Sequence, residues 1–268
     1  MRIEIASLLM VFAMCGSQAG AQNANNVPQF QVDPFWPKTL PNNWILGQVS
    51  GLATDRFDRI WVVHRPASLT ARERAAEQNP PEAKCCVAAP PVLVFDQSGN
   101  LIRHWGGAGQ GYQWPESEHG VYIDDNDFVW LAGNGKKDGQ LLKFTMDGKF
   151  VLQIGKQGEG NDSNSTERLG SPADVAVDIA AKEVFAADGY ANRRVVVFDS
   201  ETGTYKRHWG ATAKNRMTKR CRATTQRRRR RSSLAVRCIA SASTRKAWSM
   251  FATAAIIAFR FSGRTEPS

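Results

Sequence analysis

Short runs of alternating apolar and polar residues fill most of residues 45–210, and polar turns separate them. The runs recur in one order: an apolar strand ending in Asp, a polar turn, a strand with Trp or Phe, a loop, a strand ending in Phe, an Asp/Gly turn and a strand closing on Gly. Three segments follow this order, namely 51–106 (with a long insert after residue 65), 120–155 and 174–210.

The repeated order indicates a fold made of like units. Asp55, Asp124 and Asp178 mark the same point in the three segments, and Gly-containing hairpin turns lie between the later apolar runs. Four short strands per unit are typical of β-propeller blades, which need neighbours on both faces. We therefore predict an all-β fold, a partial propeller with about three blades of a ring of about six. An open β-sandwich is the alternative.

The N-terminus, MRIEIASLLMVFAMCGSQAGAQ, has one early Arg, a short apolar stretch and an Ala-Gly-Ala site before Gln22. This pattern predicts a signal peptide over 1–21, because the apolar stretch is too short to span a membrane. A buried strand and lipidation of Cys15 are the alternatives. We expect an N-terminal extension over 22–44 and export to the periplasm or the extracellular space.

Export implies an oxidising compartment, which bears on the cysteines. Cys85 and Cys86 are adjacent in a loop rich in Pro, Ala and Glu. A vicinal disulfide and two separate loop thiols are both compatible with the sequence. Neither arrangement has the spacing of a zinc site.

Charge is distributed unevenly along the chain, whose net formal charge is +10. Residues 1–210 contain 20 Lys and Arg against 24 Asp and Glu, whereas 211–268 contain 15 Lys and Arg and a single acid, Glu266. A basic tail with the run Arg227–Arg231 is compatible with a nucleic-acid-binding arm or with disorder. The tail has no Asp and one Gly, so the turns of the blades stop there.

A shifted reading frame accounts better for the tail. Regrouping the codons of 247–268 by one base permits GLVYVCDRGNNRIQVFRKNGTF, which is again a blade-like string. We therefore interpret 211–268 as an out-of-frame, non-native or disordered tail produced by the loss of one base near Ala211. On this interpretation the chain has neither a nucleic-acid partner nor a membrane anchor, since the apolar run after Ala247 is short and contains Arg260.

Three local motifs in 45–210 resemble the NHL-repeat propellers, and among them the peptidyl-α-hydroxyglycine α-amidating lyase family. IWVVHRP places Arg65 after a strand of the first blade, SEHGVYID supplies His119 at the start of the second, and AADGYANRR supplies Tyr190. The resemblance implies that His119 is a zinc ligand and that Tyr190 and Arg65 are catalytic. It also implies a structural calcium held by backbone carbonyls near Leu52 and Val121.

The implied reaction splits a carbinolamide into an amide and glyoxylate. Zinc polarises the hydroxyl, a Tyr acts as base, and an Arg holds the substrate carboxylate. The expected substrate is a peptide or small molecule in the propeller channel. Each residue also has a structural alternative: a turn histidine for His119, a surface ion pair for Arg65 and a packing residue for Tyr190.

The sequence departs from this family at the metal site. The family needs two more zinc-ligating histidines; the shifted frame permits one at the codons of Cys238 and Ile239, and the other would lie beyond Ser268. We read His64, His104 and His208 as structural. Because one His does not make a zinc site, we expect the chain as written to be inactive. A non-catalytic propeller that binds a protein, peptide or glycan is the competing hypothesis.

Overall fold

A computed structural model describes residues 31–160 and 162–210. The chain divides into two compact units, Met1–Phe35 and Trp36–Ser268, and every described strand belongs to the second. The predicted signal peptide and the predicted out-of-frame tail lie outside the described residues, so both stay predictions.

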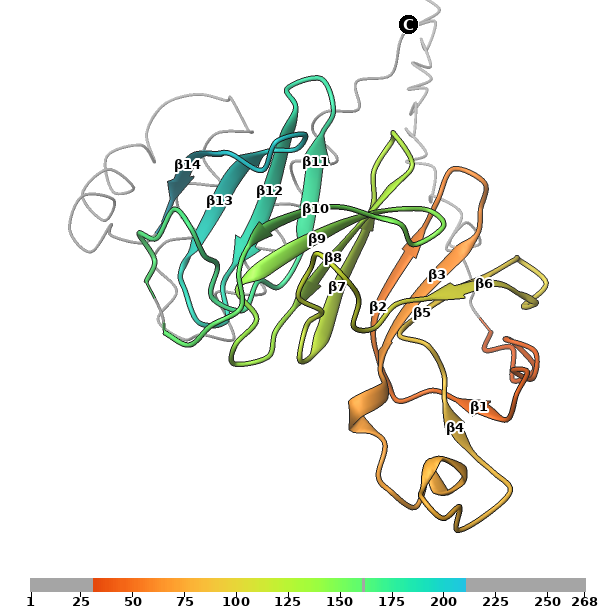
Figure 1. The fold of residues 1–268 in the computed structure, drawn as a ribbon. Coiled ribbons are helices and arrows are strands. Elements are labelled where there is room, and N and C mark those ends of the chain that lie inside the picture. The colour runs from red at the N-terminus through yellow and green to blue at the C-terminus, as the bar shows by residue number, and fades with distance from the viewer. Residues whose placement is uncertain (1–30, 161, 211–268) are drawn as a thin grey trace, which may run out of the picture. The chain divides into compact units, whose positions relative to one another are not determined.

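Three four-stranded antiparallel sheets follow one another along the chain, and in each sheet consecutive strands pair side by side (Figure 1). Blade one contains β2 (Gln48–Thr54), β3 (Ile60–Arg65), β5 (Val92–Phe95) and β6 (Leu101–Trp105). Blade two contains β7 (Glu118–Ile123), β8 (Phe128–Gly133), β9 (Gln140–Thr145) and β10 (Phe150–Gly155). Blade three contains β11 (Val175–Asp178), β12 (Glu183–Asp188), β13 (Arg194–Asp199) and β14 (Tyr205–Trp209). The predicted all-β fold with three propeller blades is confirmed.

The long insert of blade one lies between β3 and β5. It contains two 3₁₀ turns, η2 (Pro66–Ser68) and η3 (Ala75–Glu77), and the short β4 (Val87–Ala88), which pairs in parallel with β1 (Trp44–Ile45). Cys85 and Cys86 form a vicinal disulfide just before β4, which decides between the two alternatives left by the sequence. In the part of the chain that the structure describes, no helix is long and apolar enough to cross a bilayer.

A hydrophobic core joins blade one to blade two. Because side chains alternate across a strand, one apolar face of β3 and β5 meets an apolar face of blade two. The core is formed by Trp61, Val63, Val92, Val94, Val121, Val129, Leu131, Leu142 and Phe144. Each of these side chains is at most 8% exposed, so the contact between the two blades is a continuous interior.

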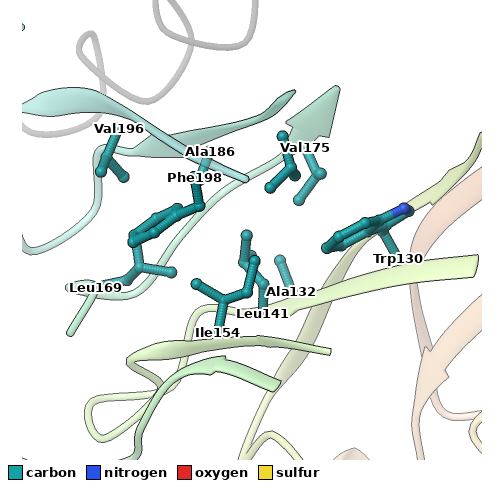
Figure 2. Close-up of a cluster of buried hydrophobic side chains, with 10 residues drawn as sticks. Trp130, Ala132, Leu141, Ile154, Leu169, Val175, Ala186, Val196 and Phe198 are labelled. Carbon is teal, nitrogen blue, oxygen red and sulfur yellow. The ribbon is translucent and has the colours of Figure 1, made fainter. Parts of the chain in front are cut away.

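A second core joins blade two to blade three, and Figure 2 shows its side chains pointing toward one another from the two sheets. Trp130 lies at one end of this cluster, and Val196, Phe198 and Leu169 lie at the other (Figure 2). Its buried members are Trp130, Ala132, Leu141, Ile154, Leu169, Val175, Val184, Ala186, Val196 and Phe198. The alternating pattern seen in the sequence thus places each blade against the next.

The repeated Asp at the end of the first strand accepts a hydrogen bond from a Trp in blades one and two. Asp55 accepts from Nε1 of Trp61 at 2.8 Å, and Asp124 accepts from Nε1 of Trp130 at 2.8 Å. In blade three the residue at the corresponding spacing from Asp178 is Val184, which has no donor. This Asp–Trp bond therefore fixes the first hairpin only in blades one and two.

Candidate functional site

His119 lies in β7 with both ring nitrogens engaged. Nδ1 lies 2.8 Å from the carbonyl oxygen of Ala173, which precedes blade three. A carbonyl only accepts, so Nδ1 carries the ring proton and Nε2 carries a lone pair. Burial lowers the pKa of His119, the carbonyl of Ala173 opposes this, and the positive charge of Arg65 lowers it further. The imidazole is therefore neutral near pH 7.

Tyr190 follows β12 in a loop of blade three. Its hydroxyl lies 2.8 Å from Nε2 of His119, and the two rings meet edge to face with centroids 5.2 Å apart. Because Nε2 has no proton, the hydroxyl donates this hydrogen bond. Two predicted site residues from different blades are thus in direct contact.

A buried carboxylate anchors the loop that carries Tyr190. Asp188 accepts hydrogen bonds from the backbone N–H of Gly170 at 2.6 Å, from Nδ2 of Asn192 at 2.8 Å and from Nε of Arg194 at 2.8 Å. Asp188 and Arg194 are both fully buried. Breaking a buried ion pair together with its hydrogen bonds is costly, so this network holds the Tyr190 loop in one position.

Arg65 ends β3 and reaches from blade one to blade two. Its Nε donates to the carbonyl oxygen of Glu118 at 2.8 Å, and its terminal nitrogens donate to Asn134 at 3.2 Å and to Gln48 at 3.4 Å. The guanidinium therefore lies against the peptide bond that precedes His119. Arg65, His119 and Tyr190 come from three blades: His119 contacts Tyr190 directly, and Arg65 contacts the backbone next to His119.

Two glycines allow the strands of neighbouring blades to approach the site closely. A Cβ at Gly51 of β2 would lie 2.7 Å from the carbonyl oxygen of His119, and a Cβ at Gly120 would lie 2.9 Å from that of Ala173. Both distances are too short for a real side chain. Glycine at these positions therefore sets the spacing between blades on which the His119 contacts depend.

Leu52 and Val121, the positions implied for a structural calcium, lie on the neighbouring strands β2 and β7. The side chain of Leu52 is 66% exposed, whereas that of Val121 is buried in the core between blades one and two. Calcium prefers oxygen ligands, which these residues could supply only from the backbone. Calcium binding here stays a prediction.

The fit of this site to zinc is partial. A metal-binding His typically donates its other ring N–H to a carbonyl, and His119 does so to Ala173. Among residues 31–160 and 162–210, however, no group of three or more His, Cys, Asp or Glu side chains could hold a metal ion. A catalytic zinc takes three protein ligands, and His119 would be one of them; zinc binding here stays a prediction.

The other histidines make contacts of a structural kind. His64 is fully buried; its Nδ1 accepts from the N–H of Gly47 at 3.1 Å, and its Nε2 lies 3.0 Å from the carbonyl oxygen of Pro90. His208 lies 2.7 Å from the hydroxyl of Tyr205 on the same strand, and the ring of His104 meets that of Trp44 edge to face.

Two buried carboxyl groups beside the site were not singled out from the sequence. Burial raises the pKa of Glu118 and the negative charge of Asp138 adds to the rise, whereas the hydrogen bond from Trp114 and the positive charge of Arg65 oppose it. Burial also raises the pKa of Asp138, against the hydrogen bonds from the N–H groups of Glu116, Ser117 and Gly135. The only available signal was an acid next to His119 in SEHG.

The fold and these contacts define a propeller of three described blades, in which His119 contacts Tyr190 between blades two and three and Arg65 binds the backbone beside His119. No protein-family model matches the chain. It is similar to peptidylglycine alpha-amidating monooxygenase of Rattus norvegicus, with 26% identity over 175 residues, which is 61% of this chain and 16% of the relative. It is also similar to the Caenorhabditis elegans protein named "Probable peptidyl-alpha-hydroxyglycine alpha-amidating lyase", with 27% identity over 173 residues, which is 63% of this chain and 46% of that protein.

The chain spans less than half the length of these two curated relatives. Among solved structures, virginiamycin B lyase from Staphylococcus aureus matches with a TM-score of 0.37 and 9% identity, over 61% of this chain and 41% of that one. The distant similarity in sequence supports a propeller related to the amidating enzymes.

Proposed function

We propose that residues 45–210 are part of an exported lyase propeller of the peptidyl-α-hydroxyglycine amidating type. The proposed reaction is cleavage of a C–N bond, releasing an amide and glyoxylate. The observation that carries the proposal is the contact between His119 and Tyr190, with Nδ1 of His119 held by Ala173 and Nε2 directed at the tyrosine hydroxyl. The sequence similarity to the two amidating enzymes supports it independently.

In this proposal each residue has a role that its contacts permit. Nε2 of His119 is one zinc ligand, and a bound zinc would polarise the substrate hydroxyl. Tyr190 would act in its deprotonated form, after its own proton has left: the phenolate takes the hydroxyl proton of the carbinolamide, the C–N bond breaks as the carbonyl of glyoxylate forms, and the same proton passes to the amide nitrogen, which returns Tyr190 to the phenolate. Arg65 holds the carboxylate of the substrate, which requires it to release Gln48 or Asn134.

The described residues contain no group of three His, Cys, Asp or Glu side chains that could hold a metal ion, so we propose that the chain as written is inactive. In this proposal, restoring one base near codon 211 adds further blades and further histidines. Zinc, and calcium near Leu52 and Val121, are the proposed metals. The proposed substrate is a peptide or small molecule in the propeller channel, and no nucleic acid or membrane takes part.

The test is glyoxylate release from a peptide ending in α-hydroxyglycine. The frame-restored protein should release glyoxylate in a zinc-dependent way, and the chain as written should not. Tyr190→Phe should slow release by about 100-fold or more, the range expected for loss of a general base. Tyr205→Phe is the matched control, because Tyr205 also bonds to a histidine, His208, but lies away from His119 on β14.

If the frame-restored protein binds no zinc, the lyase proposal is wrong. The second candidate is a non-catalytic propeller that binds a protein, peptide or glycan. The observation in its favour is that the described residues hold no metal-binding group of three or more His, Cys, Asp or Glu side chains. It predicts that the frame-restored protein releases no glyoxylate with or without zinc.

A further inference from the structure

An open groove of about 480 Å³ lies between the insert of blade one and the start of blade two. Its walls are mostly apolar: Trp44, Ala89 and Pro91 line it from the side of blade one, and Trp114 and Pro115 line it from the chain that leads into β7. Glu116 and Glu118 also line it, and no basic residue does so among the described residues. The groove therefore combines apolar walls with negative charge.

Glu118 is the buried acidic group of this groove. The residue is 6% exposed, and one of its carboxylate oxygens accepts a hydrogen bond from Nε1 of Trp114 at 2.8 Å. No basic side chain of residues 31–160 and 162–210 forms an ion pair with it. Arg65 lies near enough for its positive charge to lower the pKa of Glu118, but its nitrogens donate to the backbone carbonyl of Glu118, to Gln48 and to Asn134 rather than to this carboxylate.

Glu116 lies at the edge of the groove, where its charge would contribute less to ligand binding. It is exposed, and its carboxylate lies 3.5 Å from Nζ of Lys137, so solvent and a partner already compensate it. An exposed pair of this kind contributes little to binding. The buried Glu118 is therefore the group that a ligand would have to satisfy.

The indole of Trp114 is held rigidly beside this carboxylate. A Cβ at Gly106 would lie 2.9 Å from Cη2 of Trp114, so the ring packs directly on the backbone of Gly106. The hydrogen bond to Glu118 fixes the other edge of the ring. A rigid indole face next to a carboxylate is the environment that attracts an organic cation.

We propose that this groove binds the basic side chain of a peptide, a Lys or Arg residue. The apolar stem of such a side chain would lie along the tryptophan and proline walls, and its charged end would pair with Glu118. Pairing would give this buried carboxylate a directly bonded cation, which offsets the cost of its burial.

This site is separate from the proposed zinc chemistry. Glu118 and His119 are neighbours on β7, yet Glu118 lines the groove while His119 contacts Ala173 and Tyr190 of blade three. Binding in the groove requires no metal and no further histidine. Failure of the lyase proposal would therefore leave it unchanged.

The test compares how two small probes bind to the full chain: N-acetyl-lysine methylamide and N-acetyl-norleucine methylamide. Both ends of each probe are blocked and carry no charge. They share the apolar stem and differ in the ammonium group. Binding is followed through the indole N–H signal of Trp114 in a ¹H–¹⁵N NMR spectrum, assigned with Trp114→Phe. We expect the lysine probe to bind about tenfold more tightly than the norleucine probe, which corresponds to one charge-assisted contact.

Glu118→Gln keeps the volume of the side chain and an oxygen for Trp114, and it should bring the Kd of the lysine probe to that of the norleucine probe. Glu183→Gln is the control, because Glu183 lies in blade three and pairs with Arg207. Equal binding of the two probes to the unsubstituted chain overturns the proposal, and this comparison needs no variant to fold. Lysine binding that is unaffected by Glu118→Gln overturns it as well.

Discussion

The hydroxyl of Tyr190 donates to Nε2 of His119 at 2.8 Å, across the boundary between blades three and two. The carbonyl of Ala173 fixes the ring proton on Nδ1, so Nε2 has a single lone pair. The tyrosine hydroxyl and a metal ion therefore compete for the same lone pair. Any metal bound by His119 must displace this hydrogen bond.

Replacing Tyr190 by Phe should raise the pKa of His119 toward its ordinary value. The hydroxyl donates to the neutral ring, and loss of that donor makes protonation of Nε2 easier. An NMR titration of the ring protons of His119 measures the effect. Tyr205→Phe should leave the titration of His119 unchanged, and a lower pKa in Tyr190→Phe would contradict the assigned donor.

Stability should fall on acidification partly through His119. Burial puts its pKa in the folded chain below the ordinary value of 6.5, so the unfolded chain binds the proton more readily. The stabilisation is complete above pH 6.5 and is lost as the pH falls through the lowered pKa.

Urea unfolding between pH 7.5 and 5.5 checks this. In His119→Gln the slope of the unfolding free energy against pH should decrease by up to about 1.4 kcal/mol per pH unit, the contribution of one proton. His64 and His208, whose pKa values burial also lowers, should account for the slope that is left. An unchanged slope in His119→Gln would show that His119 is not buried in its neutral form.

Arg65→Met should destabilise the chain by about 1–3 kcal/mol, because it leaves the carbonyl of Glu118 without the donor that Arg65 supplies. Arg56→Met is a matched control. Arg56 also reaches from blade one to blade two, where it pairs with Asp127, but its side chain is 61% exposed. An exposed pair contributes about 0–1 kcal/mol, so urea unfolding should separate the two variants.

Asp124→Ala should cost about 2–4 kcal/mol, because the carboxylate accepts buried hydrogen bonds from Trp130 and from the N–H groups of Asn126 and Phe128. Asp178→Ala changes the corresponding residue of blade three, whose carboxylate accepts from the N–H of Ala181 in an exposed turn. Its cost should be below about 1 kcal/mol. Equal losses in thermal unfolding would mean that the Asp–Trp bond contributes nothing.

The disulfide between Cys85 and Cys86 predicts a labelling result. Iodoacetamide should not label the tryptic peptide that contains these cysteines before reduction, even in denaturant, and should label both after reduction. Mass spectrometry of the peptide distinguishes the two states. Labelling without reduction would favour the separate loop thiols that the sequence also allowed.

The blades could be predicted from the sequence because each repeats a local pattern. The alternation around Asp55 and Asp124 depends on neighbours in sequence, and the structure places strands where the pattern put them. Blade three keeps the same pattern, although Val184 replaces the Trp of the other two blades.

The contacts of the site could not be predicted in the same way. The hydrogen bond of His119 to Ala173 joins residues 54 positions apart, and no sequence motif reports a backbone carbonyl. The role of Glu118 depends on its burial, which follows from how the insert of blade one meets blade two. The resemblance named Arg65, His119 and Tyr190, but their mutual geometry came only from the structure.

Arg65, His119 and Tyr190 each belong to a different blade, and no single sheet holds two of them. The relative positions of these three residues therefore depend on how the three blades pack against one another. The hydrogen bond from Tyr190 to His119 therefore reports whether blades two and three are aligned: a variant that shifts one of these two sheets should change the NMR signal of Nε2 in His119 while the strands of that sheet stay intact. The same NMR measurement on a longer chain would show when these two blades are aligned.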